Sequence, residues 1–194
     1  MGASADCESI GIGLLGQPAN SLTTIGFLLA GVFIIVKRPG TRWIGGGLIA
    51  TGVGSFLFHG PMPPGNEWAH DLALAWLLAL VAGTGSRWEG LSRIPALLAM
   101  GVLFAVAPAA ADPVAVGLTV VALVSLLNMD RSAGTLGPLA LLAAAAVFGR
   151  LGATGGPLCD PDSLFQPHAV WHLGAALAVG WWALSRTSAS TARI

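Results

Sequence analysis

Charged side chains are scarce in this chain. Only 9% of its 194 residues are Asp, Glu, Lys or Arg, whereas 55% are hydrophobic and the mean hydropathy is +0.77. A soluble domain carries about 25% charged residues, so this composition excludes an ordinary soluble domain and indicates a membrane protein. The net charge is zero, and the sequence lacks the basic surface that binding to nucleic acid requires.

Basic residues are also missing from the first stretch, "MGASADCESIG". A secretory signal peptide opens with a positively charged region, so we do not expect this stretch to be one. In place of charge the chain has seven apolar runs, each near the roughly 20 residues with which a helix crosses about 30 Å of hydrocarbon. The runs are Ser21–Val36, Trp43–His59, Trp68–Gly85, Ile94–Ala110, Pro113–Met129, Thr135–Gly149 and Pro167–Ser185. The sequence therefore predicts an all-α fold, a single membrane domain (1–194) of seven transmembrane helices.

The distribution of the basic residues predicts the orientation of this bundle. Cytoplasmic loops of membrane proteins carry an excess of Lys and Arg. With the N-terminus outside, eight basic residues fall on the inner side and Arg150 alone falls outside. The eight are Lys37, Arg38, Arg42, Arg87, Arg93, Arg131, Arg186 and Arg193. We therefore expect the N-terminal segment (1–20) outside and the C-terminal tail (186–194) in the cytoplasm.

On this topology the unusual polar residues gather at the outer end. His168 and His172 are four positions apart in "PHAVWHLG", so they share one face of a helix. His59 ends the second run, with Ser55 one turn before it, and Asp71 lies near the outer start of the third. Ionisable groups in a membrane are costly and usually face a partner or a water-filled cavity.

These residue types together favour a metal site over helix-to-helix hydrogen bonds, which are the commoner role of histidines in membrane helices. Three neutral imidazoles with an open fourth position are the ligand set of a catalytic zinc, here His59, His168 and His172. The carboxylate of Asp71 can then take a proton from a water whose pKa the metal lowers towards about 7.

Several motifs near both ends of the chain carry a resemblance to a known family. They are "CE" at Cys7–Glu8, "QPANSLT" at Gln17–Thr23, "SFLFH" at Ser55–His59, the following Asp71, and "HAVWH" at His168–His172. Together they resemble the alkaline ceramidase family. That family belongs to a superfamily of seven-span metal-dependent hydrolases (CREST) that also includes the adiponectin and progestin receptors. The predicted fourth, fifth and sixth spans match only in hydrophobicity.

The resemblance implies a function and a role for each site residue. His59, His168 and His172 would bind zinc, Asp71 would act as general base, and Ser55 would hold the water or the developing oxyanion. The reaction would be hydrolysis of the N-acyl amide bond of a lipid, ceramide or a related N-acyl amine, to a fatty acid and an amine. Asp71 could bind the zinc directly or act through water, and the sequence leaves both open.

The residue before this carboxylate, His70, is expected in an outer shell of the metal or at the membrane interface, because neighbouring residues of a helix point about 100° apart.

Cys7 and Cys159 are both predicted outside, where oxidation is allowed, and the resemblance implies a disulfide between them. Eukaryotic family members also hold calcium near the N-terminus. Asp6 and Glu8 remain as possible calcium ligands here. The segment has few other oxygen ligands for a hard cation, so we do not expect a calcium site.

The short N-terminal segment suggests a compact bacterial member of the family. We therefore expect a protein of the inner (cytoplasmic) membrane with its site towards the outer face. The expected partner is a lipid substrate that enters from the membrane, and the sequence indicates no obligate protein partner.

Other membrane proteins fit less well. A retinal protein needs a lysine in the last span, and the sole lysine is Lys37. An intramembrane serine protease would need a Gly-x-Ser-Gly setting, but Ser55 is followed by Phe56. A bis-histidine haem protein needs ligands on opposite faces of the porphyrin, whereas His168 and His172 share one face of a helix. The open alternative is a receptor-like or membrane-organising protein with a structural zinc site.

Overall fold

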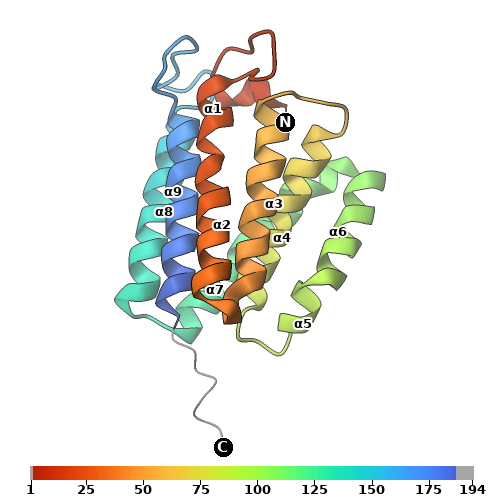
Figure 1. Cartoon of the computed structure of the whole chain (residues 1–194), viewed down its shortest axis with the longest axis vertical. Coiled ribbons are helices and arrows are strands. Elements are labelled where there is room, and N and C mark those ends of the chain that lie inside the picture. The colour runs from red at the N-terminus through yellow and green to blue at the C-terminus, as the bar shows by residue number, and fades with distance from the viewer. Residues whose placement is uncertain (1, 187–194) are drawn as a thin grey trace, which may run out of the picture.

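The computed structural model describes residues 2–186, and within them every regular element is a helix (Figure 1). The helices are α1 (Pro18–Thr23), α2 (Ile25–Lys37), α3 (Arg42–His59), α4 (Asn66–Gly83), α5 (Glu89–Ser92), α6 (Ile94–Val106), α7 (Ala111–Met129), α8 (Ala133–Leu151) and α9 (Pro167–Ser185), with 3-10 turns η1 (Ala3–Asp6), η2 (Pro39–Thr41) and η3 (Pro108–Ala110). The predicted all-α class is confirmed. Each of the seven predicted runs corresponds to helical structure. The predicted inner tail lies outside the described residues except for Arg186.

Three stretches are long and apolar enough to cross a membrane: Pro18–Lys37, Pro108–Met129 and Ala133–Leu151. They are also outer elements of the bundle, because only 33% of the first stretch and 17% of each of the others is buried. In contrast, ten of the eighteen residues are buried in α3 and ten of eighteen in α4. Helices that contact protein rather than lipid can carry more glycine and polar residues. A crossing by all seven helices stays a prediction.

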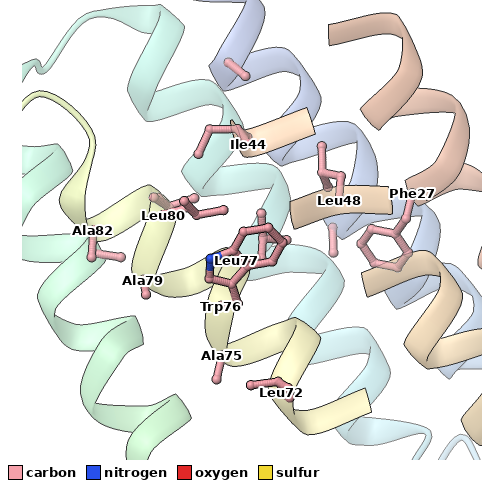
Figure 2. Packing of buried hydrophobic residues seen from close by; sticks show 14 of the residues in the cluster. Phe27, Ile44, Leu48, Leu72, Ala75, Trp76, Leu77, Ala79, Leu80 and Ala82 are labelled. Atoms are coloured by element: carbon pink, nitrogen blue, oxygen red, sulfur yellow. The ribbon is translucent and has the colours of Figure 1, made fainter. Parts of the chain in front are cut away.

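The buried core is formed mainly by α4, together with residues of α2, α3, α6, α7 and α9; Figure 2 shows part of it. Phe27 of α2, Leu48 of α3 and Trp76 of α4 belong to it. Glycines let α2 and α3 approach closely, since a Cβ added to Gly31 would lie 2.6 Å from the carbonyl oxygen of Gly45. This close approach fixes the position of α3, which carries His59 at its last residue.

The N-terminal segment and the loop between α8 and α9 lie at the same end of the bundle, at the top in Figure 1. A disulfide joins them through Cys7 and Cys159, whose Cα atoms are 5.6 Å apart, so the predicted pairing is confirmed. Helix α9 starts at Pro167, a residue suited to the first turn of a helix because its missing N–H has no partner to lose there. The end of α3 and the start of α9 lie at this same end of the bundle, next to the N-terminal segment (Figure 1).

Candidate metal centre

Three histidine rings from two helices meet at this end of the bundle. His59 ends α3, and His168 and His172 lie one turn apart on α9. The ring centroids are 5.0 Å apart for His59 and His168, 5.1 Å for His59 and His172, and 4.6 Å within α9. One nitrogen of each ring lies within 4.8 Å of the other two. The structure thus brings together the three residues that the sequence nominated as metal ligands.

The surroundings of His59 determine which of its nitrogens is free. Its ring is fully buried, and Nδ1 lies 2.6 Å from Oε1 of Gln17. The amide of Gln17 is oriented, because its Nε2 donates to the carbonyl oxygens of Ala3 at 2.9 Å and Glu8 at 2.7 Å. Nδ1 of His59 must therefore carry the hydrogen, and Nε2 has a lone pair. Nε2 is buried and has no hydrogen-bond partner among the described residues.

The other two rings are held in the same way. Nδ1 of His172 lies 3.1 Å from the carbonyl oxygen of Asn20, which can only accept, and 3.2 Å from Oγ1 of Thr23. Nδ1 of His168 lies 3.2 Å from Oδ1 of Asp6. Burial raises the pKa of the Asp6 carboxyl to about 6, and in its ionised form this carboxylate accepts a hydrogen bond from Nδ1.

All three imidazoles are consequently tied through Nδ1 and offer Nε2. This is the usual arrangement of metal-binding histidines, whose second nitrogen donates to a carboxylate, carbonyl or amide. A buried nitrogen without a partner is energetically costly, and a shared metal ion would satisfy it. The donor set fits a transition metal such as zinc. Within the described residues, no fourth His, Cys, Asp or Glu joins the group.

His70 and Asp71, at the start of α4, lie beside the three rings. Nδ1 of His70 donates to Oδ1 of Asp71 at 2.9 Å. The His70 ring stacks on Phe58 with centroids 4.6 Å apart, and its centroid is 6.4 Å from that of His59. Neither residue belongs to the group of converging ligand atoms. His70 thus lies next to the centre and orients the neighbouring carboxylate.

A cavity of about 360 Å³ between η1, α4, α7, α8 and α9 borders the centre at His168, the one of the three histidines that lines it. Its polar lining includes Asp6, His70, Asp71, Arg150 and His168. Asp71 is 28% exposed and His168 is 19% exposed, so a molecule in the cavity can reach both. The single basic residue that the topology prediction placed outside, Arg150, lies in this lining.

Ser55 is buried on α3, one turn before His59. Helices α3 and α4 approach closely at the preceding residue, because a Cβ on Gly54 would lie 2.9 Å from the carbonyl oxygen of Ala69 and 3.1 Å from Cα of His70. This approach sets the distance between the helix that carries Ser55 and the helix that carries Asp71.

The two acidic residues considered for calcium have other partners. The carboxylate of Glu8 accepts hydrogen bonds from the backbone N–H groups of Ala19 at 2.7 Å and Asn20 at 2.8 Å. It therefore satisfies free donors in the first turn of α1 and complements the positive end of the helix. Asp6 binds His168. Each carboxylate therefore has a hydrogen-bonding role within the protein.

Sequence reasoning did not predict that Gln17, Asn20 and Asp6 hold the histidines. A signal was present in "QPANSLTT", where polar residues open an otherwise apolar run. Gln17 and Asn20 are fully buried in the structure. Polar side chains that enter a membrane helix generally face a partner inside the protein.

Comparison of the chain with models of protein families, with curated proteins and with solved structures finds no match. The resemblance to the alkaline ceramidases therefore depends on the quoted motifs alone and stays a prediction.

Proposed function

We propose that this protein is a zinc-dependent membrane amidohydrolase that cleaves the N-acyl amide bond of a lipid. The observation that carries the proposal is the convergence of His59, His168 and His172, each tied through Nδ1, beside a cavity that also reaches Asp71. A structural zinc site has four protein ligands, whereas a catalytic site keeps one position open. The three-histidine group among the described residues supports the catalytic type.

The chemistry requires a nucleophile and a stabilised oxyanion, because an amide carbonyl is a poor electrophile. His59, His168 and His172 would hold the zinc through neutral imidazoles, and the bound ion would supply a water of lowered pKa and polarise a carbonyl oxygen. Asp71 accepts a proton from the attacking water as its oxygen bonds to the carbonyl carbon. It then delivers this proton to the nitrogen as the C–N bond breaks, which yields a fatty acid and an amine.

Two further side chains assist this reaction. His70 donates a hydrogen bond to Oδ1 of Asp71 and so restricts its orientation. Ser55 is buried one turn before His59, and its hydroxyl donates to the oxygen that becomes negative in the transition state, a role typical of oxyanion-hole donors.

The substrate is an N-acylated lipid, ceramide or a related N-acyl amine, which enters from the membrane. The cavity of about 360 Å³ is large enough for a head group and the first part of an acyl chain. Its position at one end of the bundle fits a substrate whose amide lies near the membrane surface.

Seven crossings with the N-terminus outside would place this cavity towards the outer face of the membrane. In a bacterial protein that membrane would be the inner (cytoplasmic) one. The connections that carry the basic residues, between α2 and α3, α4 and α6, and α7 and α8, lie at the end of the bundle opposite the histidines (Figure 1). An excess of basic residues on the cytoplasmic side supports this orientation.

The test is the release of free fatty acid from ceramide and from a panel of N-acyl amines by detergent-solubilised, zinc-loaded protein. Asp71→Asn should retain zinc and lose roughly a hundredfold or more in rate. Ser55→Ala should cost up to about 3 kcal/mol in transition-state stabilisation. Asp162→Asn is the matched control, because Asp162 is an exposed carboxylate on the loop before α9.

Two results would contradict the proposal. Hydrolysis by Asp71→Asn at the wild-type rate would remove its catalytic role. A zinc-loaded wild type that releases no fatty acid from any substrate would favour the alternative, a receptor-like or membrane-organising protein whose zinc is structural.

A further inference from the structure

The chain reverses direction sharply at Cys7, above the histidines. Cys7 has φ 70° and ψ −51°, and the N–H of Glu8 donates to the carbonyl oxygen of Asp6 at 2.9 Å. This is a γ-turn with positive φ at its central residue, a rare and strained conformation for a residue other than glycine. Such strain persists only where the surroundings hold the backbone in place.

Two interactions hold this turn, and both lead to the segment between α8 and α9. The side chain of Cys7 is bonded to Cys159. The N–H of Cys7 donates to Oγ1 of Thr154 at 3.0 Å, and this hydroxyl donates in turn to the carbonyl oxygen of Ser4 at 2.6 Å. The turn is thus fixed to the chain that leads into α9, the helix of His168.

The turn directs the two flanking carboxylates to different targets. Asp6 contacts Nδ1 of His168, with both side chains 19% exposed. Glu8 binds the N–H groups of Ala19 and Asn20. A chain that relaxed to negative φ at Cys7 could not keep both carboxylates in these positions, because the direction of the backbone before the turn would change relative to the direction after it.

We propose that Asp6 is a positioning residue that fixes His168 for the metal, and that the Cys7–Cys159 bond holds Asp6 there, so that zinc affinity depends on the disulfide. This inference rests on the proposed metal centre and extends it to the N-terminal segment. An outer-shell carboxylate fixes the orientation of a ligand histidine and raises its basicity, and its loss typically weakens metal binding roughly 10- to 100-fold.

The experiment measures the zinc dissociation constant of the full chain in detergent by competition with a chelator. Asp6→Ala should raise it roughly 10- to 100-fold, and Asp6→Glu, which keeps the carboxylate, should recover part of the loss. The matched control is Asp162→Ala, which removes an exposed carboxylate that accepts a hydrogen bond from Ser9 of the same N-terminal segment. This control should leave the constant unchanged.

The role of the disulfide is tested with a Cys7→Ser/Cys159→Ser variant. Its zinc affinity should fall by a factor similar to that of Asp6→Ala. A triple variant that combines all three substitutions should bind zinc no more weakly than Asp6→Ala alone. The absorption spectrum of bound Co²⁺ provides a second measurement, because it reports the geometry of the ligands and a merely less stable fold would not change it. Thermal unfolding of each variant identifies any that fails to fold.

Zinc binding by Asp6→Ala as tight as that of the wild type would overturn the proposal. Additive losses in the triple variant would overturn the link between the disulfide and Asp6. The measurement is of affinity, so a protein that binds zinc in this way and hydrolyses no amide would contradict only the proposed function. A wild type without measurable zinc binding would contradict both.

Discussion

Oε1 of Gln17 lies 2.6 Å from Nδ1 of His59, although the two residues are 42 positions apart in the chain. The same amide donates to the carbonyl oxygens of Ala3 and Glu8. One buried side chain therefore joins the N-terminal segment to the end of α3 and at the same time selects the nitrogen that His59 offers to a metal.

Replacement of Gln17 by methionine should weaken zinc binding roughly 10- to 100-fold, because His59 loses the acceptor that orients its ring. The measurement is the zinc dissociation constant of the full chain. Thr51→Val is the control, since Thr51 is a buried polar residue of the same helix α3 whose hydroxyl binds Gly47 and Ala73. An unchanged constant for Gln17→Met would show that His59 is oriented by packing alone.

The purified wild-type protein should contain about one zinc per chain, because the described residues form one ligand group of three histidines. His59→Ala should lose most of this metal, whereas His70→Ala should retain it, since His70 stands next to the group and outside it. Metal analysis of protein purified without chelators checks both. Equal zinc in the two variants would mean that the ion, if bound, lies elsewhere.

Gly54→Ala should destabilise the fold by about 1–3 kcal/mol, the usual cost of overpacking. The new Cβ would meet the backbone of Ala69 and His70, which cannot move aside as a flexible side chain can. Gly46→Ala, in the same helix, is the control because its Cβ would meet no atom within 4 Å, and alanine favours a helix over glycine. The midpoint of thermal unfolding in detergent should fall only for Gly54→Ala.

Orientation in the membrane can be tested with a cysteine reagent that does not cross it. In intact cells the reagent should modify Cys7 and Cys159 only after reduction, because the two are bonded. A cysteine in place of Ser132, between α7 and α8 and expected inside, should react only after the membrane is opened, in a background with Cys7 and Cys159 replaced by serine. The reverse pattern would place the histidines at the cytoplasmic face.

The elements of the fold were accessible from the sequence because each of the main helices lies in a long apolar run. Helix α9 has the predicted bounds, and α4 begins two residues before the prediction. The spacing of His168 and His172 was also informative, since four residues fix a common helix face whatever the surroundings. The convergence of His59 with this face followed from topology, which places the end of α3 and the start of α9 at the same level.

The partners of the histidines were not accessible in this way. The contacts of His59 with Gln17 and of His168 with Asp6 depend on how each helix is rotated about its axis and on a turn far away in sequence. The family resemblance suggested Asp6 as a possible calcium ligand, and a carboxylate can serve either as a metal ligand or as the acceptor of a hydrogen bond from histidine. The strained turn at Cys7 sets the direction of the chain, and this places the carboxylate of Asp6 next to His168.

The separation of 152 residues between Cys7 and Cys159 has a consequence for biosynthesis. The N-terminal segment emerges from the ribosome first, but its bonding partner and two of the three histidines follow more than a hundred residues later. The three-histidine group can therefore be completed only when α9 has packed beside α2. A nascent chain halted before that point holds one histidine of the three and a free thiol, so loss of the free thiol and assembly of the three-histidine group should both mark the completion of the fold.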